Sequence, residues 1–415
     1  MLLLLVELSL RLILGAPVAP TPFLRARWNM AGPAFRQRGE LVVPRYQQQD
    51  MVGPFAREPQ PGVPRIFVLG GSSIRAGSRI PAEHEAPGRL QELLFAAGQP
   101  AEVINLGRPA LDSQHHLEVL REAVAFQPDL LVLYMGHNDL GNTALEDRYG
   151  TVGASLGLRV RLLLGRLASY TLLERVLHPK SGLMDRGRAD GARVDPVIEA
   201  QRLGAQAGTK RDCPLDDPRR GLAARDLEDN LVAMAALAEE VGAGVVMVTP
   251  VSDWVNSAPL GSACPELLVD ASPPEHPYRS GEPRLSAQAL AAALEYAPDC
   301  PELLFERGRA RLKLGEAGAY EDLRAAMEGD PLPLRATRAM TDAVRAAAER
   351  SGARLVDLEV LAERDHRAPP PAWFRDAVHL SAQGHAVLAE AVLPVVREEL
   401  GLGSPAPTSR TSRSR

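Results

Sequence analysis

Four short, mostly apolar segments constrain the fold of this chain more than any other feature. They read RIFVL at 65–69, VINLG at 103–107, LLVLYMG at 130–136 and GVVMVTP at 244–250. Apolar runs of this length are typical of strands covered on both faces, as in a parallel sheet. Helical spacing at 87–98 and 113–127 separates the first three runs. This β-α-β-α-β order predicts an α/β fold with a parallel, doubly wound sheet.

The last part of the chain continues the same alternation. A final strand is expected at 354–359, where the sequence reads RLVDLE. Ser381 is a residue type that caps helices, so a closing helix is expected from there to about Leu400, bent at Pro394. The basic, polar residues 404–415 are expected to form a disordered tail.

Length and composition indicate a globular protein with more than one structural unit. A chain of 415 residues predicts about two or three units. Hydrophobic residues make up 45% and charged residues 24%, which is the profile of a folded chain. The net charge of −5 gives no general attraction to nucleic acid, so no nucleic-acid partner is expected.

The amino terminus carries an apolar run, MLLLLVELSLRLILGA, interrupted by Glu7 and Arg11. It is shorter than the roughly 20 residues of a spanning helix, but a helix would pair these two side chains, four residues apart. We expect residues 1–20 to be an apolar helix that anchors the chain in a membrane, with the rest extracytoplasmic; an amphipathic or buried helix is the alternative. The Pro-, Arg- and Gln-rich residues 21–64 are expected to be a linker packed against a domain.

Residues 285–335 differ in composition and hydrophobic pattern from the α/β segments around them. They are rich in Ala, Leu, Glu and Arg, and PELLFERGRARLKLG followed by AYEDLRAAMEGDP resembles a tetratricopeptide helix pair. About three repeats are needed for independent stability, so these helices must pack against the α/β domain or against a partner. They are expected to be a helical insertion between 65–284 and 336–403, and either a protein-binding surface or an insertion that binds nothing.

The three cysteines are Cys213, Cys264 and Cys300. They show no C-x-x-C spacing and no histidines at zinc-finger distances, so no metal site is expected. At most one disulfide can form. In an oxidising compartment we expect Cys213 to pair with Cys264, because both lie in Pro-rich stretches.

Ser72 follows the first apolar run, next to Gly70 and Gly71. Its hydroxyl can therefore lie at the carboxyl edge of the sheet, where open α/β folds bind ligands. The sequence fits neither a phosphate-binding loop nor a dinucleotide fingerprint. A lipase-type nucleophile elbow would need glycine where Ile74 stands. Alone, the motif could be a tight turn.

Two further motifs are expected at the same carboxyl edge of the sheet. Asn138, in GHND after the third apolar run, can donate a hydrogen bond to an oxygen that becomes negative during acyl transfer. Asp376 stands three residues before His379 and can orient a histidine that takes a serine proton. Each motif alone is common, but their joint order at expected strand ends indicates a serine hydrolase.

These residues resemble the conserved blocks of the SGNH (GDSL-like) hydrolase superfamily, which carry Ser, Gly, Asn and His in this order. The resemblance covers 65–139, 225–255 and 336–393 and brackets the helical insertion. A closer resemblance is to bacterial SGNH proteins with an amino-terminal membrane helix and tetratricopeptide-like helices inserted in the hydrolase domain. The matching stretches are RIFVLGGSS, PDLLVLYMGHND, DPLPLRATRAMTDAVR and DAVHLSAQG. The resemblance implies a flavodoxin-like, three-layer fold.

The resemblance also implies roles for single residues. Ser72 matches the nucleophile, although Gly71 stands where the family has aspartate. Ser73 competes for this role, because Gly77 follows it at the spacing found after the family's nucleophile. Ala110 stands where the family has its oxyanion glycine, and its backbone N–H survives that change.

The remaining blocks match at Asn138, Asp376 and His379. His137 is a candidate to line the pocket beside Asn138. Trp373 and Phe374 could wall the acyl site or pack in the core. The adjacent His115 and His116, near Asp112, are expected to be partly exposed on a helix rather than metal ligands.

The sequence therefore predicts an esterase or acyl hydrolase that uses Ser72, His379 and Asp376, with oxyanion donors at Ser72, Ala110 and Asn138. Its substrate would be a small-molecule, glycan or lipid ester, and no metal or organic cofactor is implied. The alternative is a catalytically degenerate, membrane-tethered scaffold that binds a protein partner through 285–335. The glycine at position 71 and the alanine at position 110 keep that alternative open.

Overall fold

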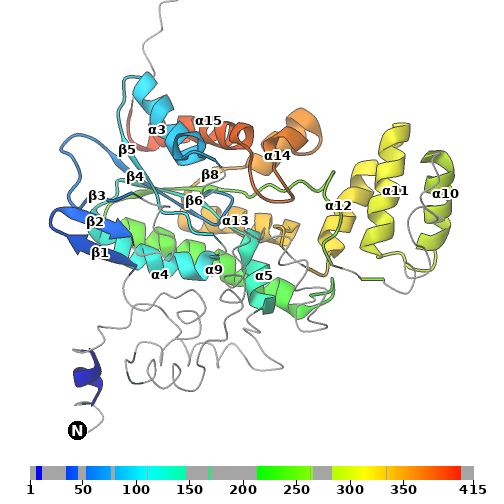
Figure 1. Ribbon diagram of the computed structural model, residues 1–415, viewed down its shortest axis with the longest axis horizontal. Coiled ribbons are helices and arrows are strands. Elements are labelled where there is room, and N and C mark those ends of the chain that lie inside the picture. Colours follow the sequence, from blue (N-terminus) through cyan, green and yellow to red (C-terminus); the bar gives the residue numbers. More distant parts are fainter. Residues whose placement is uncertain are drawn as a thin grey trace, which may run out of the picture.

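The fold centres on a five-stranded parallel sheet in a computed structural model (Figure 1). The residues that it describes are 6–11, 34–44, 53–75, 80–109, 111–145, 167, 169, 213–261, 263–264, 283–332 and 334–402. The strands are β4 (Arg65–Gly70), β5 (Glu102–Asn105), β6 (Leu130–Tyr134), β7 (Gly244–Val248) and β8 (Arg354–Val356). Their order in the sheet is β5-β4-β6-β7-β8, which is the flavodoxin-like order. The expected α/β fold is confirmed.

The sheet is buried on both faces. Alternate residues of each strand point to opposite faces and pack in two different apolar cores. Ile66 and Val68 pack with α3 (Ala86–Ala96), α14 (Leu358–His366) and α15 (Ala382–Glu399). Phe67 and Leu69 pack with α4 (Ser113–Ala123), α9 (Pro218–Glu240) and α13 (Arg338–Ser351). Figure 1 shows these two helix groups on opposite faces of the sheet. The three-layer arrangement explains why the strand sequences are continuously apolar.

Shorter elements complete the layers. They are the helix α5 (His137–Leu145) and the 3₁₀ turns η2 (Ala82–His84), η3 (Val124–Phe126) and η6 (Pro371–Trp373). The expected strand at 354–359 ends early because the Asp357 side chain accepts a hydrogen bond from the N–H of Val360 and caps α14. The Ser381 hydroxyl caps α15 as expected, accepting from the N–H of Gly384 at 3.1 Å. Pro394 lies inside this helix.

The segment expected to be a linker, 21–64, contains a small antiparallel sheet. Its strands are β1 (Phe35–Arg38), β2 (Leu41–Pro44) and β3 (Phe55–Ala56). The rings of Phe35 and Phe55 pack edge-on against Phe126, with centroids 5.2 and 5.6 Å apart. The Glu122 carboxylate on α4 accepts from the N–H of Ala34 at 2.8 Å. These contacts make the sheet part of the core on the α4 side.

The helical insertion consists of α10 (Pro283–Leu294), α11 (Pro301–Leu314) and α12 (Ala319–Gly329). It has its own apolar cluster, which includes Leu290, Leu303 and Leu323. Trp254 and Val255, from the loop after β7, belong to the same cluster. In Figure 1 the insertion projects beyond one end of the three layers. The three helices therefore pack against the α/β domain, which is one of the two expected possibilities.

The expected disulfide between Cys213 and Cys264 is wrong. The bond joins Cys264 to Cys300, whose Cα atoms are 5.9 Å apart, and Cys213 is a buried free thiol. Cys264 follows the loop after β7, and Cys300 directly precedes α11. The bridge therefore ties this loop to the insertion. Cys213 is held elsewhere, since its N–H donates to the carbonyl of Pro331 at 2.7 Å.

Residues 6–11 of the amino terminus are helical. Arg11 pairs with Glu7 at 2.8 Å, as their spacing predicts. No helix among the described residues is long and apolar enough to cross a membrane. Residues 1–5 and 12–20 of the expected anchor, and the tail 404–415, lie outside the described residues.

Gly384, at the start of α15, gives a test of the packing that holds the last segment. A Cβ at this position would lie 2.1 Å from the carbonyl oxygen of Trp373, whereas one at Gly221 on α9 would meet nothing within 4 Å. Gly384→Ala should lower the free energy of unfolding by about 2 kcal/mol or more. Gly221→Ala should leave it unchanged or raise it by up to about 1 kcal/mol. Urea unfolding measures both, and equal stabilities would contradict this packing.

Candidate active site

Ser72, His379 and Asp376 form a hydrogen-bonded chain at the carboxyl edge of the sheet. The Ser72 Oγ lies 2.8 Å from Nε2 of His379. The other ring nitrogen, Nδ1, lies 2.9 and 2.7 Å from the two carboxylate oxygens of Asp376. Ser72 lies in the turn that follows β4, and the other two residues lie between η6 and α15. The fold thus brings together three residues that the sequence singled out.

Asp376 is fixed by its own backbone. Its Oδ1 accepts the N–H groups of Val378 at 3.0 Å and His379 at 2.9 Å. Burial pushes the pKa of Asp376 upward, but the hydrogen bonds and charge of His379 and these two N–H groups outweigh it, so the pKa falls to about 2. The carboxylate is therefore ionised and holds the proton on Nδ1 of His379. Nε2 is left to accept the proton of Ser72.

The two adjacent serines have different environments. The side chain of Ser73 is 3% exposed, and its hydroxyl donates to the carbonyl of Val378 at 3.1 Å. Ser73 thus binds the turn after β4 to the segment that carries His379. Ser72 is half-buried, and it is the serine whose hydroxyl meets the histidine.

Asn138 lies directly against the turn that carries Ser72. Its Nδ2 donates to the carbonyl of Leu111 at 2.8 Å. A Cβ on Gly71 would lie 2.5 Å from the same nitrogen. The glycine at position 71 therefore leaves room for the Asn138 amide in this place. The amide has a second N–H that can serve an oxyanion.

Ala110, the other expected oxyanion donor, lies outside the described residues. The loop on either side of it is described. The N–H of Arg108 donates to the carbonyl of Gly70 at 2.8 Å, and Leu111 holds Asn138. The loop after β5 therefore runs beside the turn that carries Ser72.

The prediction that His115 and His116 are partly exposed is wrong. They are 4% and 0% exposed, because α4 is covered by α9 on the same face of the sheet. The His115 ring bonds to the Asp112 carboxylate at 2.6 Å, which also accepts from Asn142 on α5 at 2.9 Å. Burial, and then the charges of Arg108 and His115, lower the pKa of His116 to about 3.

A second hydrogen bond between α4 and α5 runs from the N–H of Ser113 to the Asp139 carboxylate at 3.0 Å. Together with the bonds of Asp112, it fixes the start of α5, where Asn138 lies. Sequence reasoning did not identify this network. Asp112 as a helix cap and the aspartate in GHND were the available signals.

The loop after β7 also holds residues at the carboxyl edge of the sheet, and the sequence did not predict this role. The N–H of Asp253 donates to the carbonyl of Ala377 at 3.0 Å, and that of Val251 donates to the Tyr134 hydroxyl at 3.2 Å. Trp373 and Phe374 are 7% and 8% exposed and belong to the core of the α3–α15 face. Of the two roles left open for these rings, core packing is the one observed.

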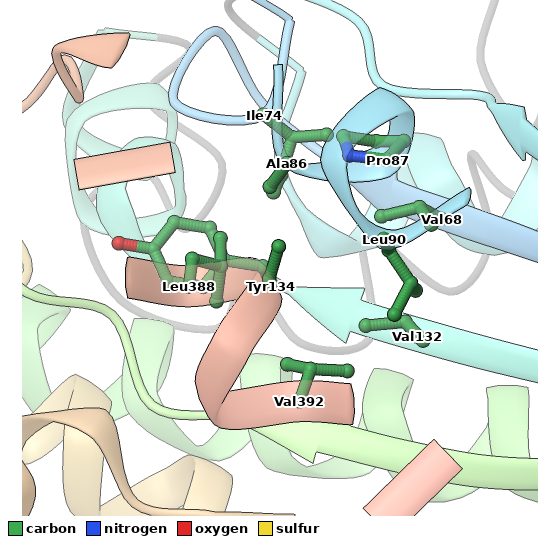
Figure 2. A pocket seen from close by; sticks show the side chains of 10 residues that line it. Val68, Ile74, Ala86, Pro87, Leu90, Val132, Tyr134, Leu388 and Val392 are labelled. Carbon is green, nitrogen blue, oxygen red and sulfur yellow. The ribbon is translucent and has the colours of Figure 1, made fainter. Parts of the chain in front are cut away.

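A small apolar cavity lies between the sheet and the helices α3 and α15 (Figure 2). Its volume of about 10 Å³ corresponds to roughly one water molecule. The lining includes Ile74 and Tyr134 near the carboxyl edge, with Val68, Val132, Ala86, Pro87, Leu90, Leu388, Ala389 and Val392. Such a space cannot hold a substrate or a cofactor.

Among the described residues, Cys264, Cys300 and Glu302 have ligand atoms close enough to share a metal ion. The disulfide engages both of these sulfur atoms. This group lies at the insertion rather than among the triad residues.

No protein-family model matches the chain, and no curated protein matches it. Several solved structures are similar to the chain. A GDSL-like lipase from Bacteroides thetaiotaomicron is 12% identical with a TM-score of 0.36, over 84% of this chain and 93% of that chain. The esterase EstA from Pseudoalteromonas is 11% identical with a TM-score of 0.36, over 81% and 98%. TesA is 13% identical with a TM-score of 0.34, over 81% and 99%. Similarity at this level carries no inference about activity.

The low pKa of Asp376 gives a test of the triad in the folded state. A carboxylate whose pKa is lowered from 3.8 to about 2 stabilises the fold above its unfolded pKa and loses this effect as the pH falls towards 2. Asp376→Asn should therefore unfold with a weaker pH dependence between pH 5 and pH 2 than the wild type. Urea unfolding at several pH values measures it. Identical pH dependence would mean that Asp376 is not held as described.

Proposed function

We propose that this chain is a serine esterase or acyl hydrolase with Ser72 as its nucleophile. The observation that carries the proposal is the 2.8 Å contact between Ser72 Oγ and Nε2 of His379, with Asp376 on the opposite ring nitrogen. A hydroxyl becomes a competent nucleophile at neutral pH only when a base accepts its proton. These three residues provide the nucleophile, the base and the group that orients the base.

The proposed acylation step uses these three residues and the expected oxyanion donors. Nε2 of His379 takes the proton of Ser72 as Oγ forms a bond to the ester carbonyl carbon. The carbonyl oxygen becomes negative and accepts hydrogen bonds from the Asn138 amide and from the backbone N–H groups of Ser72 and Ala110. His379 then gives the proton to the departing alkoxide oxygen, and the alcohol leaves.

Deacylation repeats the same sequence with a new nucleophile. A water molecule gives a proton to His379 while its oxygen attacks the acyl carbon. His379 then returns this proton to Oγ of Ser72 as the bond between Oγ and the acyl carbon breaks, which releases the acid. Another hydroxyl compound in place of water would give transacylation with the same residues. Throughout, the ionised Asp376 stabilises the imidazolium that forms on His379.

The substrate class is an ester with an O-acyl group, carried by a glycan, a lipid or a small alcohol. Every step is performed by side chains and backbone N–H groups of the chain. The scaffold alternative gains no support from the site, where Ser72, His379 and Asp376 are joined by hydrogen bonds. A partner at the insertion, α10 to α12, is compatible with either function.

The test compares two neighbouring serines in the full-length chain. Ser72→Ala should lower kcat for p-nitrophenyl acetate by at least about 1,000-fold, because it removes the attacking atom. Ser73→Ala should keep kcat within about tenfold and lower the unfolding free energy by about 1 kcal/mol, because it removes only the bond to Val378. Steady-state kinetics and urea unfolding measure these effects. Full activity in Ser72→Ala, or its loss only in Ser73→Ala, would overturn the assignment.

A further inference from the structure

His137 lies beside the triad but has no part in the acyl transfer described above. It is the first residue of α5, directly after the carboxyl end of β6 and next to Asn138. Its side chain is 6% exposed. The charges of both His379 and Asp376 act on it, so it lies within electrostatic range of the triad. It is a buried polar group at the candidate active site without a role in the mechanism.

The backbone fixes which nitrogen of His137 carries the proton. Nδ1 accepts a hydrogen bond from the N–H of Ala336 at 3.2 Å. Burial, followed by the charge of His379, lowers the pKa of His137 to about 3, so the ring is neutral at ordinary pH. A neutral imidazole that accepts at one nitrogen carries its proton on the other. Nε2–H of His137 is therefore a hydrogen-bond donor.

This donor has no acceptor among the residues that the structure describes. Buried donors of this kind are rare in native proteins and call for an explanation. The ring packs against Tyr134, with centroids 6.0 Å apart, but Nε2 makes no hydrogen bond to the Tyr134 hydroxyl. A molecule bound at the site is the natural source of an acceptor for Nε2–H.

The donor is held rigidly by the junction between the insertion and the α/β domain. Arg335, which precedes Ala336, is 2% exposed, pairs with Asp330 at 2.8 Å and donates to the carbonyl of Ser257 at 2.7 Å. Asp330 also accepts the N–H of Gly261 at 2.9 Å. These bonds fix the N–H of Ala336 and, through it, the orientation of the His137 ring. A donor fixed in advance gives orientation and specificity at little entropic expense.

We propose that His137 determines substrate specificity by donating its Nε2–H to a neutral hydroxyl or ether oxygen in the alcohol part of an O-acylated carbohydrate. The proposal rests on the function assigned to Ser72. A neutral donor supplies no countercharge to a carboxylate or phosphate that loses its water in a buried site, whereas a neutral oxygen needs none. The ester carbonyl oxygen is already taken by the oxyanion donors, and a simple acyl chain offers no other acceptor. The alcohol part of a sugar ester offers several.

The first test uses two acetate esters that differ in their alcohol part. Methyl 6-O-acetyl-glucopyranoside carries hydroxyl and ether oxygens beside the ester, and p-nitrophenyl acetate carries neither. His137→Phe should lower kcat/KM for the sugar ester at least tenfold and that for p-nitrophenyl acetate less than threefold. His137→Gln should restore most of the loss, because its amide places an N–H near the position of Nε2. His137→Leu, a smaller apolar variant, carries the same expectation if the Phe variant does not fold.

Equal losses on both esters, or no loss on the sugar ester, would overturn the proposal. A binding measurement separates this outcome from a failure of the esterase function. In Ser72→Ala protein, calorimetry should show binding of methyl 6-O-acetyl-glucopyranoside that becomes at least tenfold weaker when His137→Phe is added. An unchanged Kd, or no binding to Ser72→Ala, would overturn the role of His137 even if the wild type hydrolyses p-nitrophenyl acetate.

Discussion

One hydrogen bond, from the Ser72 hydroxyl to Nε2 of His379, joins residues that are 307 positions apart in sequence, and the rest of the site serves to hold it. The Ser73 hydroxyl binds the carbonyl of Val378, so the turn after β4 and the segment before α15 are tied together twice. The segment before α15 is also attached to the loop after β7, because the N–H of Asp253 donates to the carbonyl of Ala377. For the proposed nucleophile and base, a misplacement of about 1 Å would slow the reaction about 100-fold, and several independent bonds hold Ser72 and His379 in place.

The parallel sheet determines which residues can meet. In the order β5-β4-β6-β7-β8, the chain connections diverge between β4 and β6, and ligands in such folds bind outside the strand ends at this point. Ser72 follows β4, and Asn138 follows β6. Gly70 and Tyr134 are paired at the ends of these strands. The absence of a side chain at Gly71 lets the Asn138 amide lie against the turn that carries Ser72. Ser72 and Asn138, the proposed nucleophile and the proposed oxyanion donor, thus follow the two strands on either side of this point.

Local patterns in the sequence predicted most of the sheet, the cap at Ser381 and the motifs around Ser72, Asn138 and His379. Features that depend on contacts between distant segments could not be predicted in this way. The carbonyl of Val378 distinguishes Ser73 from Ser72, and the packing of α9 over α4 buries His115. The partner of Cys264 depends on where the insertion folds back. The helices α13 and α14 were not predicted, although Met340, Val344 and Ala347 recur at helical spacing in α13. The strands β1 to β3 were missed because strands so short resemble a linker.

The insertion is linked to the site as well as to the fold. The chain after the insertion is held by the ion pair of Asp330 and Arg335, and there the N–H of Ala336 donates to His137. Arg335 also bonds to Ser257 in the loop after β7, and this loop bonds to Ala377 beside His379. The central claim remains the identity of the nucleophile. Mass spectrometry of the full chain after reaction with a fluorophosphonate tests it most directly, because trypsin releases residues 66–75 with both serines in one peptide. Fragment ions should place the phosphonyl group on Ser72. An adduct on Ser73 or on another residue, or no adduct on the folded chain, would contradict the account.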